Sequence, residues 1–147
     1  MDLGSFYIPD KNKSSTRGDD AYFISKHHQT IGLADGVAGW AEQGIDGELI
    51  IGVRAGDVVV VGTDGLFDNV FVNEMEVAIR VLREEGCLKP QLLAKLLAEQ
   101  ALENSLIKSG DSPYTIAASK EGKFRSGGKP DDITVIVARI VPPMDIL

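Results

Sequence analysis

The sequence contains an apolar run that ends in an acidic turn, at Gly56–Asn69. Four consecutive valines, Val58 to Val61, stand between two glycines, and the run is too short to cross a membrane. A short run of this kind predicts a strand that is buried on both faces. Asp64 and Gly65 follow it, and an Asp-Gly pair after a strand is ordinary turn chemistry. Asp64 is therefore either a turn former or an oxygen ligand held on a rigid strand.

Composition indicates one globular domain with an acidic surface. The chain has 147 residues, of which 44% are hydrophobic, and its formal charge is -7. We therefore expect a single soluble domain over residues 1–147, with neither nucleic acid nor a membrane as its partner. One cysteine and two histidines exclude an internal disulfide and do not supply a zinc site. No targeting signal is visible, so we expect an intracellular protein, cytoplasmic or nuclear.

The hydrophobic pattern predicts a mixture of strands and helices. We expect an irregular lead-in over residues 1–18 and a long polar loop over residues 109–130. The first two strands are joined by a short polar segment and should form an antiparallel hairpin. The expected strands are 21–24, 30–34, a weaker candidate at 49–53, the valine run and 133–141, and the expected helices are 73–85 and 90–107.

Aspartates stand at the ends of these strands. Asp19 and Asp20 precede the first strand of the hairpin and Asp35 follows the second, so antiparallel pairing brings them to one end. Asp64 follows the valine run and Asp131 precedes the last strand. If these two strands are also antiparallel, Asp64 and Asp131 lie close together. The sequence therefore predicts carboxylates gathered at the ends of strands.

Carboxylates gathered in this way repel one another unless cations lie among them. Ligands that are all oxygen favour Mg²⁺, Mn²⁺ or Ca²⁺. A calcium-binding EF-hand loop does not fit, because Leu66 and Asp68 are the third and fifth residues of a loop that starts at Asp64, and no glutamate stands at the twelfth. Two divalent ions that activate a water for attack on a phosphoryl group fit better. The alternative that the pattern leaves open is a set of unrelated aspartates in turns.

Four motifs, in this order along the chain, resemble those of the type 2C protein phosphatases: Arg17–Phe23, Ala34–Trp40, Gly62–Asn69 and Lys129–Val135. The second is similar to the Asp-Gly-Val-Gly-Gly-Trp motif of the plant and fungal branch. The resemblance implies an α+β fold, an antiparallel β-sandwich flanked by helices. It also implies a protein serine/threonine phosphatase, which hydrolyses phosphoserine and phosphothreonine in phosphoprotein substrates with metal-activated water and two Mn²⁺ or Mg²⁺ ions.

The resemblance implies roles for individual residues. Asp35 would bridge both metals, and the carbonyl group of Gly36 would bind one of them. Asp64 and Asp131 would complete one metal site, and Asp19 would bind the second metal, where the family usually has a glutamate. Three more aspartates would lie behind these ligands or hold a third ion: Asp20, Asp68 and Asp132.

Two positions depart from the family pattern. Val37 stands where many members have a histidine that protonates the leaving group, as is common in this branch. Ser15 stands where many members have a phosphate-binding arginine. Arg17 would be able to reach the phosphate from a different register, although a solvated surface arginine is the more ordinary interpretation.

The chain is short between the second and third motifs. Only sixteen positions separate Trp40 from Gly56, whereas the family carries a long segment there with helices and several central strands. We therefore expect a domain shortened near Gly47 that lacks most of one helix layer and central strands. Surface left uncovered in this way would favour self-association. The alternative function is a catalytically impaired remnant or a regulatory binding module of the same family.

Overall fold

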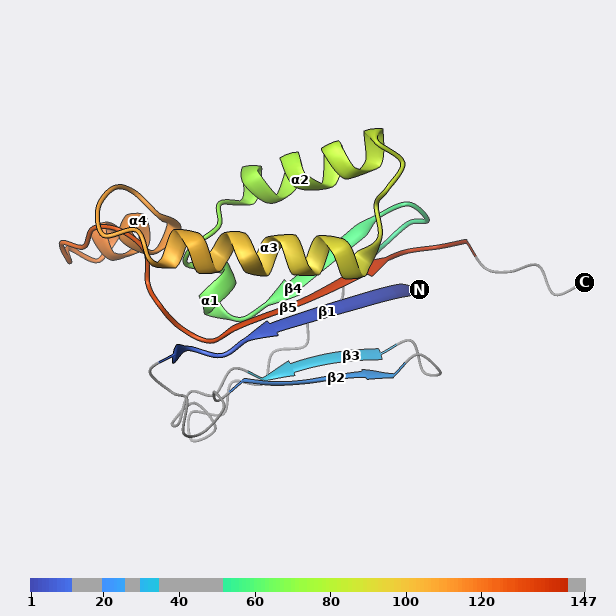
Figure 1. Ribbon diagram of the computed structural model, residues 1–147, viewed down its shortest axis with the longest axis horizontal. Helices are drawn as coiled ribbons and strands as arrows, with labels where there is room; N and C mark the ends of the chain where they lie inside the picture. The colour runs from blue at the N-terminus through green and yellow to red at the C-terminus, as the bar shows by residue number, and fades with distance from the viewer. Residues whose placement is uncertain (12–19, 26–29, 35–51, 143–147) are drawn as a thin grey trace, which may run out of the picture.

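The computed structural model describes residues 1–11, 20–25, 30–34 and 52–142 (Figure 1). Antiparallel strands and α-helices make up this part of the chain, which confirms the predicted α+β class. In chain order its elements are β1 (Asp2–Ile8), β2 (Ala21–Ser25), β3 (Thr30–Ala34), β4 (Val58–Gly62), α1 (Asp64–Phe67), α2 (Val72–Glu84), α3 (Pro90–Ser105), α4 (Pro113–Lys120) and β5 (Ile133–Arg139).

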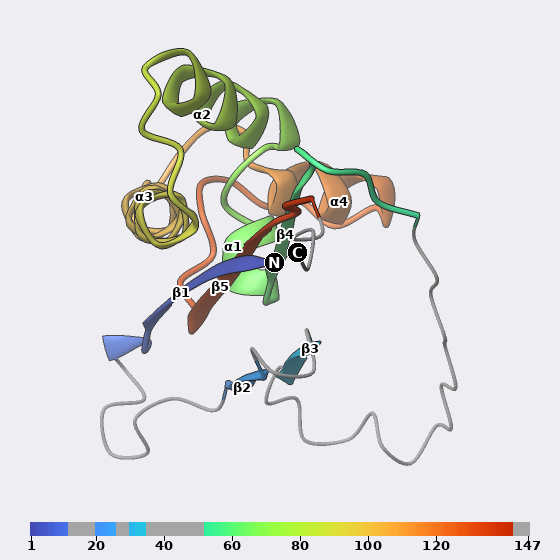
Figure 2. The same ribbon diagram turned by 90° about the vertical axis from the view of Figure 1, so that its right-hand side faces the viewer.

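The strands form two antiparallel sheets. β5 is the middle strand of a three-stranded sheet, between β1 and β4, and β2 and β3 form the predicted hairpin. Figure 2 shows α2 and α3 on one side of the three-stranded sheet and the hairpin on the other. Ser5 Oγ on β1 donates a hydrogen bond of 3.3 Å to Tyr22 Oη on β2, which links the two sheets. The arrangement confirms the expected antiparallel sandwich with flanking helices.

The main core lies between α3 and the three-stranded sheet. Leu93, Leu97 and Ala101 recur at helical spacing on α3 and are fully buried. They meet alternate residues of β5, of which Ile133 and Val135 have no exposed surface. This packing fixes β5, and with it the chain at residues 131 and 132, relative to the rest of the domain.

The two long predicted helices are confirmed. The cap of α2 is Phe71, two residues before the predicted cap at Asn73, and Glu74 Oε2 accepts a hydrogen bond of 2.7 Å from the backbone N–H of Phe71. α3 begins at Pro90, as predicted from a proline in the first turn. None of the helices in the described ranges combines the length and the apolar character needed to cross a lipid bilayer.

The irregular lead-in predicted for residues 1–18 is wrong at β1. This strand pairs with β5 along its whole length. Gly4 faces α3, and a side chain there would collide with the backbone at Pro90 and Gln91. The face that packs on the core therefore carries a glycine where an apolar residue would have marked a strand. Residues 12–18 of the predicted lead-in lie outside the described ranges.

The long polar loop predicted for residues 109–130 is also wrong, because it contains α4. Ser112 caps this helix: its Oγ accepts a hydrogen bond of 3.2 Å from the backbone N–H of Thr115, and Pro113 occupies the first turn. The start signal was therefore present in the sequence. The apolar stripe that usually accompanies it was absent, since only Thr115 and Ala118 of this helix are buried.

The valine run forms β4 but is not buried on both faces. Among the described strands β4 lies at the edge of its sheet, and its residues are all half-buried, whereas residues 133–138 of β5 are fully buried. The weaker strand candidate at 49–53 is not seen at residues 52 and 53, and residues 49–51 lie outside the described ranges. No described helix covers the outer face of the β2–β3 hairpin, in agreement with the expected lack of one helix layer (Figure 2).

Candidate functional site

Acidic side chains from separate segments converge at one end of the two sheets. β4 and β5 are antiparallel, with Gly62 opposite Val135, so Asp64 after β4 and Asp131 before β5 come together. Both contact the ammonium group of Lys129. The predicted approach of Asp64 to Asp131 is therefore confirmed. The other predicted ligands, Asp19, Asp35 and Gly36, and the phosphate-binding candidate Arg17, lie outside the described residues.

Lys129 lies among three carboxylates. Its Nζ donates to Asp64 Oδ2 at 2.5 Å and to Asp68 Oδ2 at 2.9 Å, and it lies 3.5 Å from Asp131 Oδ2. Partial burial disfavours the charged form of the lysine, but the hydrogen bonds to Asp64 and Asp68 outweigh this effect and raise the pKa of Lys129 above its usual value. Lys129 is therefore a cation at neutral pH. It offsets part of the negative charge of these three aspartates, which we call the acidic cluster.

Asn69 fixes the backbone of Lys129. The Asn69 side chain accepts a hydrogen bond of 2.9 Å from the Lys129 N–H and donates one of 2.8 Å to the Lys129 carbonyl oxygen. The same amide group donates to the carbonyl oxygen of Gly65 at 2.9 Å. Asn69 is 1% exposed, so water cannot replace these bonds. One buried side chain thus ties the turn after β4 to the segment before β5.

Asp20 lies at the same end, held by two threonines. Thr134 Oγ1 donates to Asp20 Oδ2 at 2.7 Å, and Thr63 Oγ1 donates to the same oxygen at 3.0 Å. Burial raises the pKa of Asp20, the two hydroxyl groups lower it, and the nearby charges of Asp132 and Asp131 raise it again, so that the net shift is upward. Asp20 therefore adds to a region in which negative charge is concentrated.

The chain at Asp131 and Asp132 packs tightly on the turn after β4. Asp132 is 2% exposed, and its Oδ1 accepts a hydrogen bond of 2.6 Å from the backbone N–H of Asp10. Asp131 Oδ1 accepts one of 2.9 Å from the N–H of Asp132. Gly65 lies so close to the Asp132 carbonyl oxygen that a Cβ atom would collide with it. Gly65 is needed for this close approach of two backbone segments.

The donors of the acidic cluster suit a hard divalent cation in type and in charge. Asp64, Asp68 and Asp131 offer only carboxylate oxygens, and all three already surround one positive charge. In the part of the chain that the structure describes, no group of three or more His, Cys, Asp or Glu side chains could hold a metal ion by itself. A complete metal centre would therefore also need ligands from outside the described ranges.

Sequence reasoning missed several residues that shape this site. Lys129 had a signal, because it is a basic residue two positions before Asp131. Thr63 and Asn69 stand inside the recognised motif, but only the structure shows what they hold. Tyr114 had no signal: its ring centroid lies 5.9 Å from Lys129 Nζ, and its N–H donates to the Asp68 carbonyl oxygen at 3.0 Å.

No protein-family model matches the chain. The chain is, however, similar in sequence to several known proteins. The chain is 26% identical over 239 residues to "Probable protein phosphatase 2C 55" of Arabidopsis thaliana. This alignment covers 93% of this chain and 51% of the relative. It is 41% identical over 92 residues to "Protein phosphatase PTC7 homolog fig" of Drosophila grimshawi, in an alignment that covers 61% of this chain and 30% of the relative. The chain thus spans about half the length of the first relative and less of the second.

One solved structure has a similar fold. It is the X-ray structure of the photosystem II phosphatase PBCP, with a TM-score of 0.75 and 21% sequence identity. The similarity covers 94% of this chain and 98% of the other. At this level of identity it establishes the shared α+β fold.

Proposed function

The chain is related in sequence to the type 2C protein phosphatases, and we propose that it is a metal-dependent protein serine/threonine phosphatase. The observation that carries this proposal is that Asp64, Asp68 and Asp131 gather around the ammonium group of Lys129 at the end of the sandwich. Its substrates would be phosphoserine and phosphothreonine residues of other proteins.

In this proposal, Asp35 would bridge two divalent ions and the carbonyl group of Gly36 would bind one of them. Asp64 and Asp131 would complete one of the two sites, and Asp19 would bind the second ion. We propose Mn²⁺ or Mg²⁺, two ions in all, because the donors are oxygens. When bound, such ions lower the pKa of a water ligand and neutralise charge on the phosphoryl group. Three aspartates would support these ligands or hold a third ion: Asp20, Asp68 and Asp132.

The described residues hold Asp64 and Asp131 close together before any ion binds. The β4–β5 register sets the spacing between Asp64 and Asp131, and Asn69 locks the two segments together. Lys129 limits the repulsion between the carboxylates. A site held in this way loses little freedom on binding, which favours precise placement of a phosphate ester. Arg17 remains a candidate for contact with the phosphate.

Thermal unfolding with and without Mn²⁺ tests the metal site separately from the chemistry. A ligand that binds only the folded chain raises its melting temperature. We expect Mn²⁺ to raise it and EDTA to reverse the rise. Asp35→Asn should remove most of the effect, since Asp35 is proposed to contact both ions. An undiminished rise in this variant would show that the assignment of Asp35 is wrong.

The second candidate function is a catalytically impaired remnant or a regulatory binding module. One observation favours it: the alignment with the Arabidopsis relative runs over 239 positions although this chain has 147 residues. Long stretches of the relative therefore have no counterpart here. This supports a shortened domain, for which we propose a position near Gly47. Cooperative unfolding of the purified chain without metal-dependent phosphate release would favour the second candidate over the first.

A further inference from the structure

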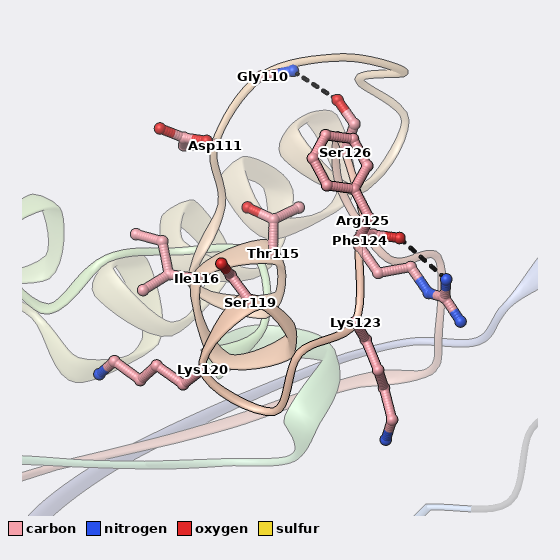
Figure 3. Close-up of a pocket in the computed structure, with 10 residues that line it drawn as sticks. All are labelled: Gly110, Asp111, Thr115, Ile116, Ser119, Lys120, Lys123, Phe124, Arg125 and Ser126. Atoms are coloured by element: carbon pink, nitrogen blue, oxygen red, sulfur yellow. Dashed lines mark hydrogen bonds between the residues drawn. The ribbon is translucent and has the colours of Figure 1, made fainter.

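A pocket of about 450 Å³ lies beside the acidic cluster, between α4 and the loop that follows it (Figure 3). Thr115 and Ser119 line it from α4, and Phe124 and Ser126 line it from the loop. Gly110 N donates a hydrogen bond of 3.2 Å to Ser126 Oγ across the opening (Figure 3). None of these residues has a role in the proposed metal centre.

The walls of the pocket are tied together by buried bonds. Ser112 Oγ, at the start of α4, donates to the carbonyl oxygen of Gly127 at 2.8 Å. The N–H of Gly127 donates to the carbonyl oxygen of Gly110, also at 2.8 Å. Ser112 is 6% exposed and Gly127 is buried, so the bond between these two residues is shielded from water. The loop therefore has a fixed place over α4.

One tyrosine contacts both a residue of the pocket and the acidic cluster. Arg125, which lines the pocket, donates from Nε to Tyr114 Oη at 3.2 Å. The ring of Tyr114 lies 5.9 Å from Lys129 Nζ. A peptide whose phosphorylated residue reaches the acidic cluster would therefore have neighbouring residues near the pocket.

The pocket carries positive charge on an acidic protein. Lys120, Lys123 and Arg125 line it, against one carboxylate from Asp111, whereas the formal charge of the whole chain is -7. Lys123 is 2.8 Å from Glu121, but both side chains are more than half exposed, so this ion pair holds the lysine only weakly. The pocket is thus electrostatically matched to an anionic partner.

The shape of the pocket favours an extended partner. Figure 3 shows the side chains of Lys120, Lys123 and Arg125 leaving the pocket in different directions. A single phosphate group would need them to converge on one point. Phe124 is 95% exposed, which is unusual for a large apolar side chain and leaves its ring available to a partner. Spread positive charges with an exposed aromatic ring suit an acidic peptide that also carries an apolar residue.

We propose that this pocket binds an acidic segment of the phosphoprotein substrate, next to the phosphorylated residue, with an apolar residue of that segment against Phe124. The inference rests on the proposed phosphatase function and names a class of substrate for it. The pocket contributes affinity and selectivity for the substrate segment, while the acidic cluster supplies ligands for the proposed metal ions that hydrolyse the phosphate ester.

Two phosphothreonine peptides of equal length test this proposal. Both carry the same apolar residue, and one has glutamates where the other has glutamines. We expect the wild-type chain to prefer the acidic peptide in kcat/KM by roughly fivefold to tenfold, as about two exposed charge pairs would give. The double variant Lys123→Glu and Arg125→Glu should lose or reverse this preference. Phe124→Ala should raise KM for both peptides.

Lys95→Glu is the matched control, because Lys95 is an exposed lysine on α3 that pairs with Glu99 outside the pocket. The Lys95→Glu variant should keep the wild-type preference for the acidic peptide. An equal rate on both peptides, or a preference that survives the double variant, would overturn the docking proposal while the phosphatase function stands.

An aryl phosphate too small to reach the pocket separates the two proposals. If it is not hydrolysed, the phosphatase proposal fails, and binding of a labelled acidic peptide, followed by fluorescence anisotropy, then decides the docking. Binding that the double variant weakens, and Lys95→Glu does not, would support the pocket. Equal binding by all three chains would refute it.

Discussion

Lys129 Nζ donates a hydrogen bond to Asp64 Oδ2 at 2.5 Å, at the position where the proposed metal ligands meet. The same ammonium group contacts Asp68 and Asp131. In the proposed metal site, a Mg²⁺ ion bound by Asp64 and Asp131 would lie about 2.0–2.1 Å from their oxygens, where it would repel the ammonium group. We therefore predict that the lysine stabilises the metal-free chain and competes with metal binding.

Replacement of Lys129 by methionine should change two quantities in opposite directions. Without metal, the melting temperature should fall, because three carboxylates lose their shared counter-charge. With Mn²⁺, the rise above the metal-free value should be larger than in the wild-type chain, because no internal cation has to leave. Thermal unfolding over a series of Mn²⁺ concentrations measures both.

Lys95→Met is the control for the loss of one exposed lysine, and it should alter neither quantity strongly. A fall in melting temperature that is the same with and without Mn²⁺ would mean that Lys129 only supports the fold. The competition would then be absent.

Asn69→Ala should lower the free energy of unfolding by about 1–3 kcal/mol, the usual cost of leaving buried polar groups without partners. The change removes both bonds to the Lys129 backbone and the bond to Gly65. Urea unfolding monitored by circular dichroism measures it. Asn73→Ala is the control, because Asn73 is exposed at the start of α2. Similar losses in the two variants would contradict the role given to Asn69.

Gly65→Ala should destabilise the chain and weaken its response to Mn²⁺. The added methyl group would collide with the carbonyl oxygen of Asp132 and push the segments that carry Asp64 and Asp131 apart. Gly52→Ala is a matched control, because no atom lies within 4 Å of a Cβ there. If Gly65→Ala and Gly52→Ala unfold at the same temperature and respond alike to Mn²⁺, the close approach has no functional importance.

The sequence was informative where a local pattern determined the structure. The hairpin of β2 and β3 and the helices α2 and α3 followed from periodicity and end signals. The approach of Asp64 to Asp131 followed from the antiparallel pairing of β4 and β5 alone. For the hairpin and the two helices, neighbouring residues in the chain carry the information, whereas the approach of Asp64 to Asp131 was predicted on the condition that β4 and β5 pair in antiparallel fashion.

The sequence was uninformative where a distant contact decided the structure. β1 is a strand because it pairs with β5, which lies more than a hundred residues away, and Gly4 hides its alternating pattern. The valine run of β4 is typical of a central strand, yet β4 lies at the edge of the sheet that the described residues form, because strand order does not follow from apolar content. Lys129 enters the acidic cluster through the bonds of its backbone to Asn69, and a linear pattern does not show such bonds.

The purified chain should self-associate or be only marginally stable. In the described ranges, no helix covers the outer face of the β2–β3 hairpin (Figure 2). Uncovered apolar surface and strand edges favour association. Light scattering over a range of protein concentrations should show a mass that rises with concentration. A constant monomer mass together with cooperative unfolding would refute this expectation.

Release of phosphate from a phosphothreonine peptide, measured with and without Mn²⁺ for the wild-type chain and for Asp131→Asn, tests the proposed function most directly. We predict release that requires Mn²⁺, at a rate below that of a full-length relative, since a site loosened by 1 Å loses on the order of a hundredfold. Asp131→Asn should lose most of that release while it still folds. Release without metal, or release that Asp131→Asn leaves unchanged, would contradict the proposal that this cluster of aspartates is the active site.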